Sequence, residues 1–202
     1  MLPLWADLLA TVVFGLSGAL LAKESSLDVV SAAGLAIVAG TGGGIVRDVV
    51  LGDTPPVAFE EWSILVAASA AVIVAAVLPR GRGRWHGLYV VADAAGLGLV
   101  TAAGTLKSLD AGLGAYPAIL LGVLSGVGGG VVRDLLATRL PMVLHPEVYA
   151  TAALAGAVVV ALIGVEPTGI AITAGATTTF LVRVVSRWRH WEVPRLGREG
   201  GR

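Results

Sequence analysis

Charged side chains within apolar stretches are the first residues of this sequence that could do chemistry. The string Gly40-Thr-Gly-Gly-Gly-Ile-Val-Arg-Asp48 returns as Gly126-Val-Gly-Gly-Gly-Val-Val-Arg-Asp134, and its two arginines lie 86 residues apart. An Arg or Asp inside a bilayer costs about 2.5–3.5 kcal/mol on insertion scales unless it is paired or hydrated. Each Arg-Asp pair therefore needs partners or water.

Two further aspartates occupy matching places in the sequence. Asp7 and Asp93 are also 86 residues apart, and each lies near the start of an apolar run. We predict that Asp7 pairs with Arg47 and that Asp93 pairs with Arg133, because the members of each pair fall at the same depth. Adjacent helical residues point in different directions, so each Arg should not pair with the Asp that follows it.

On this interpretation, Asp48 and Asp134 are free to face a polar path or a neighbouring helix. Carboxylates along such a path provide the negative potential that a cation route requires. The alternative is that the paired charges only fix the register of the helices, and both interpretations can hold together.

The glycines before each Arg suggest a second source of cation ligands. Glycine is about 1 kcal/mol worse than alanine in a helix, so three in a row predict a break or kink. A break would expose backbone carbonyls, which membranes tolerate only where protein or water satisfies them. We expect both breaks to line one water-filled path, although glycines also let helices approach closely. The residues are Gly42, Gly43, Gly44, Gly128, Gly129 and Gly130.

Seven helices must position these groups. The chain of 202 residues is 56% hydrophobic and only 14% charged, which is typical of a membrane protein. We predict an all-α membrane protein with seven transmembrane helices, from apolar runs near the length that spans a bilayer. These runs are Leu4–Ala22, Leu27–Leu51, Ser63–Leu78, Leu88–Leu106, Leu113–Leu136, Val148–Val165 and Gly169–Val185.

The 86-residue shift covers a whole three-helix unit. It also relates Gly18 to Gly104, Pro55 to Pro141 and Glu61 to Glu147. A unit of three crossings must enter the bilayer upside down in its second copy, which predicts an inverted 3+3 repeat. The expected divisions are residues 1–80, an inverted unit at 87–166, a seventh helix at 167–188 and a basic cytoplasmic tail at 189–202.

The basic residues predict the orientation. Arginines gather after the third and seventh runs, and basic loops face the cytoplasm. The amino terminus is then outside, and Lys107 is the one basic residue left in an external loop. Leu21 occupies the matching position, so Lys107 breaks the symmetry at the outer mouth. It either regulates entry or is a surface lysine that extends toward water.

Several classes of function are excluded by composition. The chain has no cysteine, its three histidines lack ligand spacing, and its 14 basic residues balance 14 acidic ones. We therefore expect no cofactor, no metal beyond permeating K⁺ or Na⁺, no nucleic-acid partner and no enzymatic activity. His145 and Glu147 beside Asp134 have no accompanying nucleophile, which favours an ordinary loop.

The duplicated Gly-Gly-Gly-x-Val-Arg-Asp motif in this arrangement resembles the prokaryotic branch of the trimeric intracellular cation (TRIC) channel family. This branch is related to bacterial inner-membrane proteins with a duplicated glycine-transporter-type domain. The resemblance implies a homotrimer in the inner membrane, in contact with lipids, which can bind to it. It also implies that each subunit has a potassium- and sodium-permeable pore between its kinked second and fifth helices. The alternative is a secondary transporter of a small amino acid such as glycine, since broken helices in inverted repeats are equally typical of transporters.

Overall fold

The predicted apolar helices are all present. The computed structural model describes residues 4–78 and 86–193, so the arginines at 80–84 and the tail beyond 193 lie outside the described residues. Within these described residues, five helices are long and apolar enough to cross a membrane, and α4 and α7 are shorter, with 16 and 14 residues. The apolar helices are α1 (Leu4–Glu24), α2 (Val29–Leu51), α4 (Trp62–Val77), α5 (His86–Asp110), α6 (Ala115–Leu136), α7 (Ala150–Ile163) and α8 (Thr168–Trp188).

Two short helices were not predicted. The helix α3 (Val57–Glu60) precedes α4, and the 3₁₀ helix η1 (Met142–Leu144) precedes α7. Both begin directly after a proline, Pro56 or Pro141, whose fixed φ suits the start of a helix. They occupy related places in the two repeats and, as described below, each is held by an aspartate of the repeated motif.

The ends of α2 show how local sequence delimits a span. Asp28 caps the amino-terminal end, because its side chain accepts a hydrogen bond of 2.7 Å from the backbone N–H of Ser31. Gly52 ends the helix in the left-handed conformation, at a φ of 74°, which glycine adopts without strain. Together these residues confine α2 to the apolar run.

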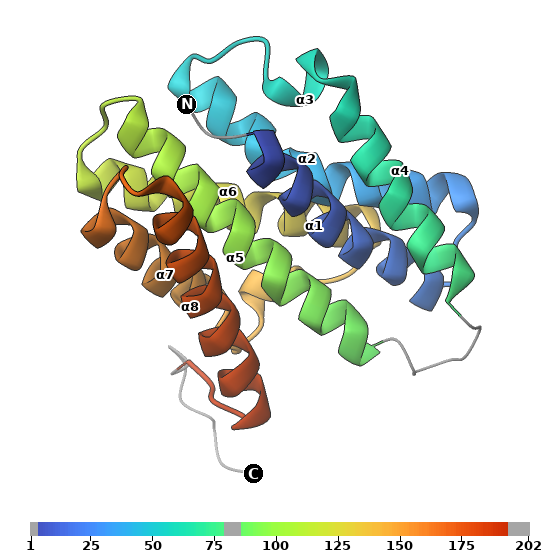
Figure 1. The fold of residues 1–202 in the computed structure, drawn as a ribbon. Helices are drawn as coiled ribbons and strands as arrows, with labels where there is room; N and C mark the ends of the chain where they lie inside the picture. Colours follow the sequence, from blue (N-terminus) through green and yellow to red (C-terminus); the bar gives the residue numbers. More distant parts are fainter. Residues whose placement is uncertain (1–3, 79–85, 194–202) are drawn as a thin grey trace.

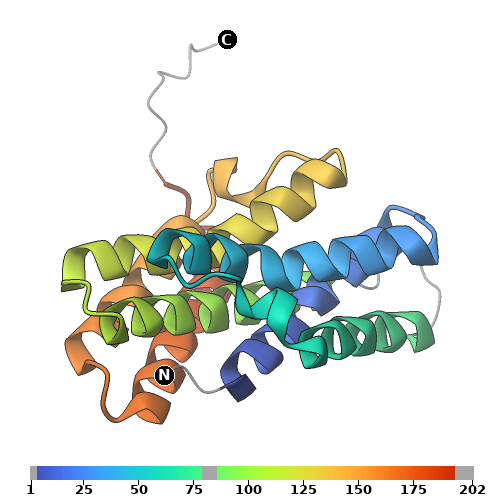
Figure 2. The same ribbon diagram turned by 90° about the horizontal axis from the view of Figure 1, so that it is seen from above.

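The helices pair in the same way in both repeats (Figures 1 and 2). In the first repeat α1 packs on α2 and α4, and in the second α5 packs on α6 and α7. Across the two repeats α1 contacts α5, and α2 contacts α6. The last helix, α8, packs on α5 and α7 and has no related helix in the first repeat.

Side-chain contacts show that the related helices run in opposite directions. Asp7 at the start of α1 and Lys107 near the end of α5 both reach the end of α2. Ser17, late in α1, and Asp93, early in α5, both reach Arg133 near the end of α6. The start of each helix therefore lies beside the end of its counterpart, as an inverted repeat requires.

The predicted glycine breaks are wrong. Helices α2 and α6 continue through Gly42–Gly44 and Gly128–Gly130 without interruption. A Cβ atom on Gly43 would collide with the backbone carbonyl of Ser125, and one on Gly129 would lie 2.5 Å from the carbonyl oxygen of Ala39. The glycines thus let α2 and α6 approach closely, because the absence of side chains allows the two backbones to touch.

The outer faces of the bundle are apolar. On α4, the alanines Ala67, Ala68, Ala71 and Ala75 are buried, whereas the larger Ile73 and Val77 are exposed. In a bilayer such a surface meets lipid tails, and small residues are typical of helix contacts. Polar groups are consequently collected in the interior.

Candidate functional site: two buried charge clusters

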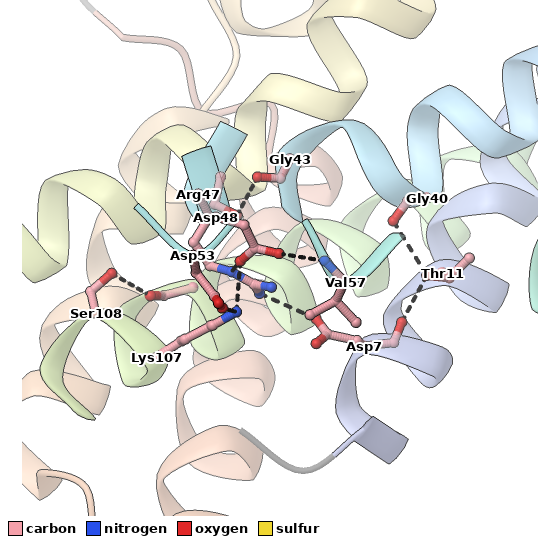
Figure 3. A network of polar contacts seen from close by, with 12 residues as sticks. Asp7, Thr11, Gly40, Gly43, Arg47, Asp48, Asp53, Val57, Lys107 and Ser108 are labelled. Carbon is pink, nitrogen blue, oxygen red and sulfur yellow. Dashed lines mark hydrogen bonds and ion pairs between the residues drawn. The ribbon is translucent and has the colours of Figure 1, made fainter. Parts of the chain in front are cut away.

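The first charge cluster joins the ends of three helices (Figure 3). It consists of Asp7 from α1, Arg47 and Asp48 from α2, Asp53 from the loop after α2, and Lys107 from α5. Nη1 of Arg47 lies 3.2 Å from Oδ1 of Asp7, and its Nε lies 2.8 Å from Oδ1 of Asp48. Arg47 and Asp48 are each only 1% exposed. The guanidinium is therefore neutralised inside the bundle by two carboxylates.

Lys107 links the second repeat to this first cluster. Its Nζ lies 2.8 Å from Oδ1 of Asp48 and 2.5 Å from Oδ2 of Asp53. The ammonium group thus bridges the end of α2 and the loop that follows it (Figure 3). Because α5 belongs to the other repeat, this bridge holds the two repeats together at this end.

The second charge cluster is centred on Arg133 of α6 and is more deeply buried. Its Nη1 lies 2.7 Å from Oδ1 of Asp93, and its Nη2 lies 2.8 Å from Oδ1 of Asp134. Arg133 also donates hydrogen bonds to Ser17 Oγ at 2.6 Å and to Tyr89 Oη at 3.0 Å. The guanidinium of Arg133 is therefore well satisfied, as a buried charge requires.

Both aspartates of the repeated motif also hold a short helix. Oδ2 of Asp48 accepts a hydrogen bond of 3.3 Å from the backbone N–H of Val57, the first residue of α3. Oδ2 of Asp134 accepts one of 3.1 Å from Met142, the first residue of η1. Each aspartate thus fixes the chain that leads from the second helix of its repeat into the third.

These contacts confirm two sequence predictions and correct two others. Asp7 pairs with Arg47 and Asp93 with Arg133, as expected from their matching depths. The expectation that each Arg avoids the following Asp is wrong, because the flexible Arg side chain curls back so that Nε meets the adjacent carboxylate. Asp48 and Asp134 are consequently engaged in ion pairs and buried, rather than free to face a path.

The two clusters differ in their access to water. In the first, the side chains of Asp7 and Lys107 are 17% and 15% exposed, whereas in the second Asp93 and Arg133 are 1% and 0% exposed. Aromatic rings cover the second cluster, since the guanidinium carbon of Arg133 lies 5.6 Å from the ring centre of Phe14. Only the first cluster is open to solvent.

Each cluster contains one more carboxylate than cation. The first has three aspartates against Arg47 and Lys107, and the second has two against Arg133. A net negative charge in a region of low dielectric attracts small cations. Each cluster, taken by itself, therefore favours a cation over an anion.

A group on α8 was missed by the sequence analysis. Arg183, 1% exposed, lies 2.7 Å from Glu147 through Nη2 and Oε2, and its guanidinium stacks 5.1 Å from the ring centre of Tyr149. Arg187 binds the other oxygen of Glu147 at 2.6 Å. A charged residue inside an apolar run indicates a functional site, so the position of Arg183 in the seventh run could have been recognised from the sequence.

The ion pairs of Glu147 also shift its titration. Partial burial alone would raise the pKa of this loop carboxyl, but the hydrogen bonds and positive charges of Arg183 and Arg187 outweigh burial and hold it below the ordinary value of 4.5. Glu147 is therefore ionised at neutral pH and ties α8 to the second repeat.

No metal centre accompanies these clusters in residues 4–78 and 86–193. There, no three His, Cys, Asp or Glu side chains are grouped so that they could hold a metal ion. The aspartates are instead occupied by arginine, lysine and backbone N–H groups. Within the described residues, these aspartates are therefore bound by groups of the chain itself.

Comparison with known proteins places the chain in a family. The family described as "Glycine transporter" matches it twice, over residues 4–80 and 90–164. The chain is 36% identical to the UPF0126 inner membrane protein YadS of Escherichia coli strain K12, over 96% of each protein. It is also 36% identical to a UPF0126 membrane protein of Deinococcus radiodurans, over 93% of this chain and 88% of that protein.

Solved structures share the fold over almost the whole chain. A TRIC trimeric intracellular cation channel orthologue from Rhodobacter sphaeroides matches with a TM-score of 0.84 and 32% identity, over 93% of this chain and 98% of the other. A prokaryotic TRIC channel matches with a TM-score of 0.85 and 25% identity, over 93% and 96% of the two chains. These neighbours are channels and not enzymes, in agreement with the prediction that this chain is not an enzyme. The chain therefore belongs to the family of bacterial membrane proteins that carry a duplicated glycine-transporter domain, and it resembles the prokaryotic TRIC channels in sequence and fold.

Proposed function

We propose that this protein is a monovalent-cation channel in which each subunit conducts K⁺ and Na⁺ along a path between α2 and α6. The observation that carries the proposal is the match to a TRIC cation channel over 93% of the chain at 32% identity. A shared fold alone does not imply function. The charge clusters of this chain supply the additional chemical argument.

The contact between α2 and α6 supports the position of the path. A Cβ atom on Gly42 would lie 3.4 Å from Cα of Gly129, so the two triple-glycine segments meet where the helices cross. Gly42, Gly44 and Gly128 remain partly exposed at this crossing. Because these glycines have no side chains, none projects into a path that would run beside this crossing.

The charge clusters would serve the two ends of this path. Arg47 and Arg133 lie one helical turn beyond the glycines, and two aspartates neutralise each guanidinium. The neutralised arginines would not repel cations, and the remaining carboxylate charge at each end would attract them. Lys107, at the solvent-accessible end, would moderate this attraction at the outer mouth.

We further propose a homotrimer in the prokaryotic inner membrane, with bound lipid and with the amino terminus outside. The trimer rests on the relationship to the trimeric TRIC orthologue, and the orientation rests on the distribution of basic residues. In this orientation the first cluster faces outward and the second faces the cytoplasm. A cysteine introduced at Ala111 should react with an impermeant maleimide on intact cells, whereas one at Ser26 should react only after permeabilisation.

A transporter of glycine is the second candidate. Its support is the description of the matching family and the inverted repeat, which is typical of secondary transporters. A carrier requires a closed site that is exposed alternately to each side, whereas a channel provides a continuous wet path. The two proposals therefore predict different dependence on the solute.

One experiment separates these functions. Purified protein is placed in a planar bilayer under a potassium gradient, with and without glycine, and in proteoliposomes for glycine uptake. Unitary potassium currents that ignore glycine support the channel. Saturable glycine uptake without resolved currents would establish the transporter and reject the channel.

A further inference from the structure

The interior of the bundle is closed unequally at its two ends. At the end of the second cluster, Tyr149 precedes α7, and its ring points back into the bundle, where it packs with Leu97 of α5 and Val127 of α6. Its hydroxyl oxygen lies 3.0 Å from the position that a Cβ atom on Gly130 would take. Tyr149 thus covers the last glycine of the second triple-glycine segment.

A second aromatic ring meets the same glycine. The Cζ atom of Phe14 from α1 lies 3.4 Å from the same Cβ position, and Nη2 of Arg133 lies 3.7 Å from it. Phe14 and Tyr149 are both buried, at 0% and 2% exposure. Two rings and a guanidinium therefore fill the space beside Gly130.

The first repeat lacks both rings. The 86-residue shift relates Tyr149 to Ser63 and Phe14 to Val100, which are much smaller side chains. At the related glycine, Gly44, Nη2 of Arg47 lies 3.8 Å from an added Cβ, and apart from the backbone of α2 itself no other atom of the described residues comes within 4 Å. The same backbone arrangement is thus filled by aromatic rings at one end and left open at the other.

Contacts from α8 hold Tyr149 in place. The Arg183 guanidinium stacks on the Tyr149 ring and forms an ion pair with Glu147. It also lies within 3.5 Å of the backbone oxygen of Val148, so Arg183 contacts three consecutive residues. Within the part of the chain that the structure describes, the Tyr149 hydroxyl is buried and lacks a hydrogen-bond partner. A buried unpaired hydroxyl is unfavourable, so the inward position of Tyr149 depends on the contacts of its ring.

We propose that Tyr149, positioned by Arg183 and assisted by Phe14, is the side chain that closes the second-repeat end of the cation path. This inference rests on the proposed channel function. The side chain blocks the path when its ring lies against Gly130, and it opens the path when the ring leaves. Because α8 lies outside the repeat, only the second-repeat end has this closure.

The test combines cation flux with thiol accessibility, since the chain has no cysteine of its own. A single cysteine is introduced at Val127, behind Tyr149, and membrane vesicles of defined sidedness are treated with a charged methanethiosulfonate. Tyr149→Ser carries the residue of the related position, and Tyr116→Ser is the matched control, because Tyr116 is 75% exposed. Should Tyr149→Ser not fold, Phe14→Val makes the same test with the residue found at Val100.

In the Val127→Cys background, Tyr149→Ser should raise the rate of thiol modification by about tenfold, and only when the reagent is added from the second-repeat side. This factor is the effect of losing one aromatic–cation contact from the closed state. Potassium flux should rise by a similar factor, and Tyr116→Ser should change neither. Increased accessibility without potassium flux in any variant would support the closure and reject the channel. Unchanged accessibility and unchanged flux in folded Tyr149→Ser and Phe14→Val proteins would overturn the inference.

Discussion

Nη1 of Arg133 lies 2.7 Å from Oδ1 of Asp93, and both side chains are buried almost completely. The related pair, Arg47 and Asp7, is separated by 3.2 Å, and Asp7 is 17% exposed. The two pairs have the same chemistry and occupy related positions, but only the pair between Asp7 and Arg47 has access to solvent. They therefore provide an internal comparison of a buried and a partly hydrated ion pair.

Asp93→Asn should lower the free energy of unfolding by about 3–5 kcal/mol, because it leaves the Arg133 charge under-compensated in a buried site. Asp7→Asn should have a smaller effect, because water can solvate Arg47 through the partly exposed partner. Denaturant unfolding in mixed micelles measures both values. Equal destabilisation by the two variants would show that the difference in burial has no energetic consequence.

Gly43→Ala should destabilise the protein by about 1–3 kcal/mol, the usual effect of overpacking, and should reduce cation flux. The reason is that the added methyl group collides with the Ser125 carbonyl and separates α2 from α6. Gly34→Ala is the matched control in the same helix, because beyond the backbone of α2 no atom of residues 4–78 and 86–193 lies within 4 Å of its added Cβ. Thermal unfolding should show the control to be at least as stable as the unmodified protein, and its cation flux in liposomes should be unchanged.

Lys107→Met should increase potassium conductance at low salt by about fivefold, the effect of roughly 1 kcal/mol of Coulomb energy at a pore mouth. The increase should shrink as salt is added, since the Debye length falls to about 10 Å at 0.1 M. Lys107→Arg retains the charge and should retain the original salt dependence. Single-channel recordings over a salt series measure the conductance of each variant. If the conductance of Lys107→Met at low salt is below that of the unmodified protein, Lys107 does not lie at the mouth.

Lowering the pH should release α8 from the loop before α7. The pKa of Glu147 is depressed below 4.5 in the folded protein, so its ion pairs contribute stability above that pH and lose it as the pH falls through the depressed value. The melting temperature of the unmodified protein should therefore drop more steeply below about pH 4.5 than that of Glu147→Gln. Parallel pH profiles of the two proteins would contradict this role of Glu147.

The sequence was sufficient to predict the spans because lipid restricts what can cross it. Apolar runs near 20 residues long have few alternatives to helices, and the duplicated motif then indicated an inverted arrangement. The partners of Arg47 and Arg133 also followed, because matching depth limits the available carboxylates. The short helices α3 and η1 escaped prediction, since four or fewer residues carry too little periodicity.

The interior contacts were harder to predict, because they depend on side-chain reach and on helix crossing. Whether three glycines break a helix depends on what lies opposite them, and here the opposite backbone takes the space. The pairing of Arg133 with the adjacent Asp134 depends on a curled side-chain conformation that sequence spacing does not encode. Ser125 gave no signal among other small residues, yet its hydroxyl donates to the Gly43 carbonyl at 3.0 Å.

The crossing of α2 and α6 bears on how such a protein could have arisen. Gly43 meets the Ser125 carbonyl, and the related Gly129 meets the carbonyl of Ala39, so each half offers the other the same surface. Two identical half-length chains, inserted in opposite directions, could make both contacts as a dual-topology dimer. In the single chain, Lys107, Tyr149 and the last helix have no equivalent in the first repeat, and they distinguish the two ends of an otherwise symmetric arrangement.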